Sequence, residues 1–213
     1  MLINFTNLGH FLQLIIVLLS FLNLIVIMKF IFLIFILFSS NFVSIKVNSN
    51  ESLIQSLKKE GKLIFIRHAY APGSGDPNNF DIKNCLTQRN LNDEGRNQAK
   101  LIGLFFKKNT IPIEGVFSSE WCRCRETASI AFEGNYKTKN FLNSFYEKKF
   151  LQNKDTQIKD LKKYIMSWDG IKNLVFITHY VVISEVLDVY PSSGEIVISD
   201  KNFNVIGNLQ FNF

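Results

Sequence analysis

Two short apolar runs constrain the fold of this chain more than any other feature of its sequence. The runs Lys62–Ile66 (KLIFI) and Asn173–Thr178 (NLVFIT) are almost continuously apolar, as expected of strands that are covered on both faces. Between them a helical pattern begins at Asn92, a suitable N-cap, with acidic residues in its first turn and basic ones near its end at Lys108. Strands that alternate with helices predict an α/β fold with helices on both faces of a sheet.

The remaining elements follow from shorter patterns. Apolar residues at helical spacing predict further helices, and brief β-rich runs predict further strands. These predictions are a helix over 52–59 that stops before Gly61, a strand at Val116–Ser118, a helix from there to Ala131, a helix from Thr156, and a terminal pair of strands at Glu195–Ser199 and Phe203–Ile206.

Residues 1–50 differ sharply in composition from the rest of the chain. They contain no Asp or Glu and only two basic residues, Lys29 and Lys46. Two apolar stretches, Phe11–Ile27 and Phe30–Phe38, follow each other in this segment. A membrane-spanning helix needs roughly 20 apolar residues, so neither stretch is a comfortable span by itself.

Two interpretations of this segment remain open. Read from Met28, it has one lysine, an apolar run and then small and polar residues, which are the parts of a secretory signal peptide. This interpretation makes Met28 the true start of the protein. The alternative is an uncleaved anchor, residues 12–38, that attaches the protein to a membrane. Both place the domain formed by residues 51–213 outside the cytoplasm, as an exported, periplasmic or membrane-anchored protein.

Charge and cysteine content exclude two classes of function. Beyond residue 50 the chain has 22 basic and 18 acidic residues, a net charge of only +4, and its lysines are scattered. This pattern does not favour nucleic-acid binding. The three cysteines, Cys85, Cys122 and Cys124, allow one disulfide and one free thiol. No second cysteine pair or spare histidine accompanies Cys122-x-Cys124, so we expect no metal site.

Two of the three histidines follow directly on the apolar runs. His68 comes after Arg67 at the end of the first run, and His179 follows the second, whereas His10 belongs to the apolar N-terminal segment. Ligands of open α/β sheets bind outside the carboxyl ends of strands, so His68 and His179 should meet there if their strands are parallel neighbours. Arg123, at the start of the helix after the next strand, should lie near the same edge. Its guanidinium fork suits phosphate oxygens.

These features resemble the histidine phosphatase superfamily, or phosphoglycerate mutase-like fold. The likeness covers about residues 61–199, and its motifs occur in the family's order. They are Arg67-His68 at a strand exit, Ser-Ser-x-x-x-Arg-x-x-x-Thr-Ala at 118–128, His179 after a late strand, and Leu-Asn-Asp-Glu-Gly-Arg-Asn-Gln-Ala at 91–99, which is similar to the family's Leu-Thr-x-x-Gly-x-x-Gln-Ala.

The resemblance implies a three-layer α/β/α fold with a mostly parallel central sheet, preceded here by the apolar N-terminal segment. Two positions depart from the family pattern: Ala69 stands in place of the glycine of Arg-His-Gly, and Tyr180 in place of the glycine of the late His-Gly. Neither change removes a group that does chemistry.

The resemblance also implies an activity. A metal-independent phosphatase without a cofactor would hydrolyse phosphomonoesters, or phosphorylated side chains, through a phosphohistidine on His68. Arg67, Arg123 and His179 would surround the phosphate oxygens and stabilise the charge of the transition state. Family members often place a general acid in the middle of the chain, and Glu147 is our first candidate for it. Asp76 is the second.

The long loop Tyr70–Arg89 contains two prolines and two glycines, and structureless loops of this length are often functional. We expect it to border the pocket, with Arg89, Asp76 and Tyr180 among the substrate contacts. Cys85 lies in this loop, and its pairing with either Cys122 or Cys124 would fix the loop beside the site.

Two other functions are kept as alternatives. The lack of an assured acid and the presence of Tyr180 favour a catalytically silent module that binds a phosphorylated ligand. A sugar-phosphate mutase needs a closed site for a two-phosphate intermediate, for which this chain is short. A small phosphorylated molecule is the expected partner in each case, and the oligomeric state stays open.

Overall fold

The computed structural model describes residues 19, 27–29, 49–59 and 61–211 of the 213-residue chain. The signal or anchor predicted for residues 1–50 lies almost wholly outside this part and stays a prediction. None of the helices in the described ranges is both long and apolar enough to cross a membrane. Residues 48–213 form a compact unit of their own.

Six strands form the central sheet in the order β3-β2-β4-β1-β5-β6. The pairings of β1 with β4, β4 with β2 and β2 with β3 are parallel, whereas β5 is antiparallel to both β1 and β6. The prediction of a mostly parallel sheet is therefore confirmed. The strands are β1 (Leu63–Arg67), β2 (Ile113–Ser118), β3 (Lys137–Thr138), β4 (Asn173–Thr178), β5 (Ile196–Ser199) and β6 (Val205–Leu209).

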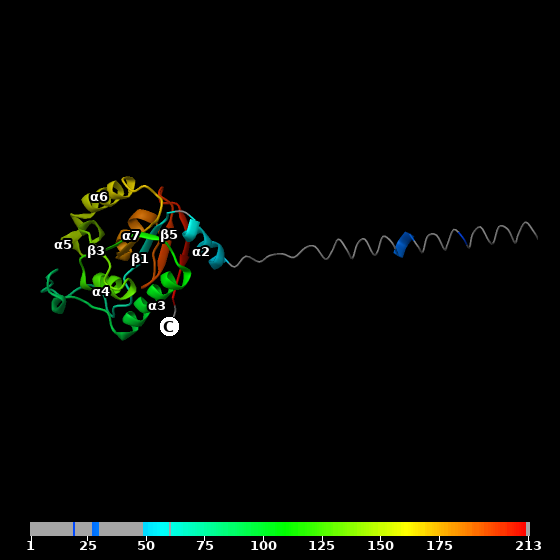
Figure 1. Ribbon diagram of the computed structural model, residues 1–213. Helices are drawn as coiled ribbons and strands as arrows, with labels where there is room; N and C mark the ends of the chain where they lie inside the picture. Colours follow the sequence, from blue (N-terminus) through cyan, green and yellow to red (C-terminus); the bar gives the residue numbers. More distant parts are fainter. Residues whose placement is uncertain (1–18, 20–26, 30–48, 60, 212–213) are drawn as a thin grey trace, which may run out of the picture. The chain divides into compact units, whose positions relative to one another are not determined.

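Helices cover both faces of this sheet, as Figure 1 shows. Alternate residues of β1 point to opposite faces, because side chains in a strand have a period of two. Ile64 and Ile66 belong to a core shared with α2, α3 and α4, whereas Leu63 and Phe65 belong to a core shared with α6 and α7. The helices are α2 (Ser49–Lys59), α3 (Asp93–Asn109), α4 (Cys122–Ala131), α5 (Lys148–Leu151), α6 (Lys154–Met166) and α7 (Tyr180–Leu187), with short 3-10 helices η1 (Cys85–Thr87) and η2 (Asn140–Leu142).

Most predicted elements are present, and the differences have local causes. Asn92 caps α3 as predicted, its side chain accepting from the backbone N–H of Gly95. The prediction that the last strand begins at Phe203 is wrong: Phe203 has a φ of 67° and lies in a turn that Asp200 closes. Helix α6 begins two residues before the predicted Thr156, and the sequence patterns did not predict α7.

The register of the parallel strands places three strand ends at one edge of the sheet. Arg67 of β1 pairs with Thr178 of β4, so the next residues, His68 and His179, emerge side by side. Ser118, the last residue of β2, pairs with Ile177 of β4. The predicted meeting of the two histidines is confirmed by this register.

Candidate active site

His68 follows β1 directly and is buried. Its Nδ1 lies 2.8 Å from the carbonyl oxygen of Ala69. Since a carbonyl oxygen only accepts hydrogen bonds, Nδ1 carries the ring proton, and Nε2 is unprotonated and can accept a hydrogen bond. Nε of Arg123 donates to this Nε2 at 3.2 Å. The geometry therefore leaves Nε2 of His68 unprotonated and next to a guanidinium.

Arg123 joins the parts of the site. It lies in the first turn of α4 and is buried. Its Nη2 is 3.5 Å from Nδ1 of His179, and its Nη1 donates to the two carboxylate oxygens of Asp76 at 2.9 and 3.2 Å. A single guanidinium thus reaches both histidines and a carboxylate of the connection between β1 and α3, which contains the predicted loop Tyr70–Arg89 and is called here the 70–91 loop.

His179 is held by a chain of polar side chains. Its Nδ1 faces the donor Nη2 of Arg123 and therefore accepts, so Nε2 carries the proton and donates to Oγ of Ser119 at 3.0 Å. Ser119 Oγ in turn donates to Oδ1 of Asn143 at 3.1 Å. Nδ2 of Asn143 donates to Glu120 at 2.6 Å. This chain fixes the tautomer and the orientation of the ring.

A cavity of about 190 Å³ lies over these groups and is lined by the strand-end residues, the loop and the segment before α5. Arg67 and Arg89 also line it. Nη1 of Arg67 donates to the carbonyl of Pro191 at 2.9 Å, whereas its Nε is buried and has no hydrogen-bond partner among the described residues. Arg89 donates from Nε to the carbonyl of Gly75 at 3.0 Å and from Nη1 to that of Ala71. Arg89 therefore also braces the loop.

Burial and positive charge set the protonation of the site. Burial, followed by the charge of Arg123, holds the pKa of His68 well below its usual value, and the same two causes act on the pKa of His179. Both rings are therefore neutral near pH 7. Burial alone would raise the pKa of Asp76, but the charge of Arg123 and hydrogen bonds from Arg89 N and Trp121 outweigh it and lower that pKa.

The two candidates for the general acid lie side by side. Oε1 of Glu147 accepts from the backbone N–H of Asp76 at 3.0 Å, and both residues line the cavity. Glu147 also forms an ion pair with Lys149 at 3.0 Å. The carboxylate of Asp76 accepts hydrogen bonds from Arg123 and from Nε1 of Trp121, the latter at 3.1 Å. With its lowered pKa, Asp76 is ionised near pH 7, which disfavours it as a proton donor.

The sequence motifs contain positioning residues that we did not assign beforehand. Oγ1 of Thr127 accepts from the N–H of Ala69 at 3.0 Å and donates to the carbonyl of Arg123 at 2.7 Å, which ties the residue after His68 to α4. Gln98 accepts from the N–H of Tyr70 at 2.9 Å. A Cβ at Gly95 would lie 1.9 Å from the carbonyl oxygen of Tyr70. The motif at residues 91–99, at the start of α3, thus holds Tyr70 at the start of the loop.

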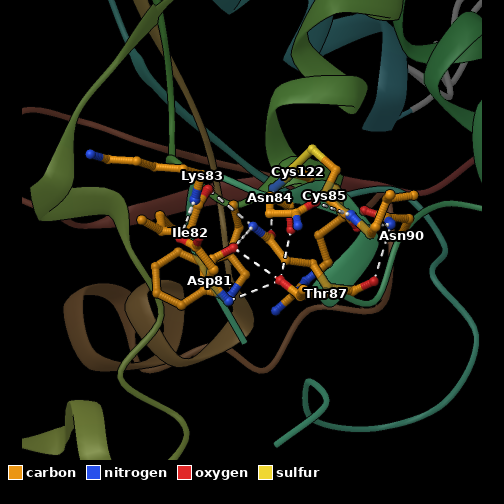
Figure 2. Close-up of a disulfide and its surroundings, with 12 residues drawn as sticks. Asp81, Ile82, Lys83, Asn84, Cys85, Thr87, Asn90 and Cys122 are labelled. Carbon is orange, nitrogen blue, oxygen red and sulfur yellow. Dashed lines mark hydrogen bonds between the residues drawn. A yellow bond between two sulfur atoms is a disulfide. The ribbon is translucent and has the colours of Figure 1, made fainter. Parts of the chain in front are cut away.

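A disulfide joins the loop to α4 (Figure 2). Cys85 is bonded to Cys122, next to Arg123, and the prediction that Cys85 pairs with one of these two cysteines is confirmed. The backbone N–H of Cys122 also donates to the side chain of Gln88 at 2.9 Å.

Cys124 is a free, buried thiol, and burial raises its pKa to about 12. Within the described ranges no group of three or more His, Cys, Asp or Glu side chains could hold a metal ion.

Comparisons with known proteins show the family and the fold of this chain. A sequence model of the histidine phosphatase superfamily (branch 1) matches residues 63–169, whereas no curated protein matches the chain. The solved structure of the protein histidine phosphatase SixA complexed with tungstate has a TM-score of 0.51 at 15% identity, over 70% of this chain and 96% of SixA.

Two further structures have the same fold. A protein from Agrobacterium tumefaciens, proposed to be the phosphohistidine phosphatase SixA, has a TM-score of 0.51 at 15% identity over 71% of this chain and 99% of its own. A Thermus thermophilus protein, TTHB049, has a TM-score of 0.50 at 16% identity over 70% of this chain and 99% of its own. The family match spans half of the chain and includes the segments that carry Arg67, His68 and Arg123. This chain therefore belongs to the histidine phosphatase superfamily.

Proposed function

We propose that this protein is a phosphatase that hydrolyses phosphate esters through a phosphohistidine formed on His68. The observation that carries the proposal is the unprotonated Nε2 of His68, 3.2 Å from Nε of Arg123. A neutral imidazole nitrogen is a nucleophile once its lone pair is released from the hydrogen bond of Arg123, and guanidinium groups stabilise the charge of a phosphoryl group in transfer. The SixA structure of the same fold is complexed with tungstate, which is a tetrahedral oxyanion like phosphate.

In the first step, Nε2 of His68 forms a bond to phosphorus while the bond from phosphorus to the leaving oxygen breaks. Arg67 and Arg123 surround the remaining phosphate oxygens, and His179, whose Nε2 proton is donated to Ser119, positions Arg123 through Nδ1. Arg67 lines the cavity and would contribute its positive charge to this binding. In the second step, water attacks phosphorus and returns one proton to the carboxylate of the general acid, the N–P bond breaks, and inorganic phosphate leaves with His68 again neutral.

Glu147 protonates the leaving oxygen in this scheme. It lines the cavity beside Asp76 and, unlike Asp76, does not pair with a guanidinium of the site. Asp76 instead holds Arg123 in place. When phosphate enters, Nη1 of Arg123 exchanges a hydrogen bond to Asp76 for one to a phosphate oxygen.

The activity is tested by hydrolysis of 4-nitrophenyl phosphate by the purified full chain, in the presence of a chelator. We expect turnover that falls to background in His68→Ala, because that variant lacks the nucleophile. Rapid quenching in base followed by ³¹P NMR should detect a phosphohistidine in the wild type. Turnover that survives in His68→Ala would contradict the proposal.

The acid is tested with two leaving groups. Loss of a general acid slows the release of phenol from phenyl phosphate more than that of 4-nitrophenol, because the better leaving group needs less protonation. Glu147→Gln should therefore lower kcat by a larger factor for phenyl phosphate, and Asp76→Asn should lower both rates by a similar factor. The reverse pattern would assign the acid to Asp76.

A phosphate-binding module without catalysis is the second candidate. The two candidate acids favour it, because the carboxylate of Asp76 is paired with Arg123 and that of Glu147 with Lys149. A folded protein that binds inorganic phosphate in calorimetry and yet forms no phosphohistidine would support this alternative over the phosphatase.

We also propose that the protein acts outside the cytoplasm, exported or anchored through residues 12–38. The apolar N-terminal segment and the Cys85–Cys122 disulfide support this location, since disulfides persist in oxidising compartments. The N-terminal sequence of the mature protein, after cell fractionation, tests it. A start near residue 50 indicates cleavage, and an intact membrane-bound chain indicates an anchor. An intact chain in the cytosol would contradict both.

A further inference from the structure

Two tyrosines line the cavity without a role in the phosphoryl transfer described above. Tyr146 lies between η2 and α5, and 53% of its surface is exposed. Tyr180 is the first residue of α7 and is half-buried. Their ring centroids are 5.8 Å apart, with the ring planes inclined by 61°. Two aromatic rings therefore converge beside the groups that would receive phosphate.

Tyr180 is held in position by Arg67. The guanidinium carbon of Arg67 lies 5.3 Å from the centre of the Tyr180 ring, and the carbonyl of Pro191 fixes the same guanidinium from Nη1. A cation over a ring face is attractive and restricts the ring. Because Tyr180 is already ordered, it loses little side-chain freedom when a ligand packs against it.

The size and charge of the cavity restrict what lies beyond the phosphate. Its volume of about 190 Å³ is below the roughly 300–1,000 Å³ of pockets that enclose a whole small ligand. The rest of a substrate must therefore extend past the lining residues that reach solvent, among which is Tyr146. Three arginines line it, but Arg67 and Arg123 would bind the first phosphate, and Arg89 donates to loop carbonyls. A second phosphate would meet the carboxylate of Glu147, which disfavours bisphosphates.

Building on the phosphatase function proposed above, we propose that Tyr146 and Tyr180 bind a planar aromatic ring to which the substrate's phosphate is attached. Aromatic rings attract one another in offset-stacked or edge-to-face arrangements at centroid distances of about 4.5–7 Å. Each such contact strengthens binding about 2- to 10-fold. The ring belongs either to a small aryl phosphate or to a phosphorylated tyrosine or histidine side chain.

The test uses phosphonates, which the enzyme cannot hydrolyse, so that it measures binding separately from catalysis. Titration calorimetry on the full chain gives Kd for phenylphosphonate and for cyclohexylphosphonate, each relative to methylphosphonate in the same variant. We expect the wild type to prefer the flat phenyl ring over the cyclohexyl ring about 3- to 10-fold. This preference should disappear in Tyr146→Leu with Tyr180→Leu and persist in Tyr146→Phe with Tyr180→Phe.

Two controls keep the test independent of folding and of the proposed function. Tyr190→Leu replaces an exposed tyrosine that does not line the cavity and should leave the preference intact. Tyr146→Leu alone alters an exposed side chain and should already weaken the preference. Hydrolysis of phenyl phosphate without any phenyl preference in binding overturns this inference and leaves the phosphatase proposal standing. A phenyl preference without hydrolysis overturns the phosphatase proposal only.

A second arm distinguishes the two sources of the ring. Phosphonomethyl-phenylalanine is titrated as the free amino acid and within a five-residue peptide. Tighter binding of the peptide assigns a phosphorylated side chain, and equal or weaker binding assigns a small aryl phosphate. Failure of the enzyme to bind any of these phosphonates would overturn the inference.

Discussion

The strand ends and the 70–91 loop both line the cavity, but different interactions hold them there. His68 and His179 follow two paired parallel strands, so the backbone register of the sheet places them together. The loop has only the short helix η1. It is held by the Cys85–Cys122 disulfide, by the ion pair of Asp76 with Arg123, and by Arg89, which binds loop carbonyls.

The two regions should therefore respond differently to the substitution of a single side chain. A strand end is fixed by many backbone hydrogen bonds, and the loss of one side chain leaves its position intact. The loop depends on a few side-chain links, each of which can be removed singly. We therefore expect substitutions of the proposed catalytic groups at the strand ends to lower mainly the reaction rate, and substitutions in the loop to lower mainly the stability.

The largest effect is expected from removal of the disulfide. The bond closes a segment with a sequence separation of 37 residues, and the chain-entropy relation gives a stabilisation of about 4 kcal/mol for a closed loop of that length. Cys85→Ser with Cys122→Ser should lower the free energy of unfolding in urea by up to this amount. Reductant should destabilise the wild type and leave the double variant unchanged. A loss below about 1 kcal/mol would show that the other links suffice to hold the loop.

The next largest effect is expected on kcat, from substitution of Arg123, which contacts both strand-end histidines. Lysine cannot reproduce the donors with which Arg123 contacts His68, His179 and Asp76. Arg123→Lys should lower kcat about 10²- to 10³-fold, close to the effect of losing one oxyanion donor. Arg125→Lys, in the same helix, is the matched control. Similar losses in both variants would argue against a direct role of Arg123.

Gly95→Ala tests the contact that joins the loop to α3. The added Cβ would lie 1.9 Å from the backbone carbonyl of Tyr70, so either the helix or the loop must shift, at a cost of about 1–3 kcal/mol. Thermal unfolding of this variant should show the loss, and Asn97→Ala, on the exposed side of the same helix, should not. Equal melting temperatures for the two variants would contradict the contact.

The last expected effect is a pH dependence of stability. The pKa values of His68 and His179 are lowered in the folded protein, whereas in the unfolded chain they return to about 6.5. As the pH falls below that value, the unfolded chain takes up protons that the folded protein does not. The free energy of unfolding should therefore fall from pH 7.5 to pH 5.5 in urea titrations, and less steeply in His179→Asn. Greater stability at pH 5.5 would refute the lowered pKa values.

The fold was predictable to the extent that it depends on local patterns. Two almost continuously apolar runs predicted buried strands, and Asn92 predicted the start of α3, because burial periodicity and caps are properties of a few neighbouring residues. Phe203 was wrongly assigned to a strand, because its apolar side chain hides the turn that Asp200 closes through its backbone. Helix α7 was not predicted, since its largely apolar sequence lacks a polar face.

The sequence by itself determined which groups stand at the ends of the strands: Arg67, His68 and His179, each next to an apolar run that must be buried. Only the tertiary structure decided what surrounds them. It showed that Nε2 of His68 faces Arg123, that Asp76 is paired with this arginine, and that Tyr146 meets Tyr180 at the cavity. These contacts join residues that are far apart along the chain, and their partners depend on packing in three dimensions, which no local pattern encodes.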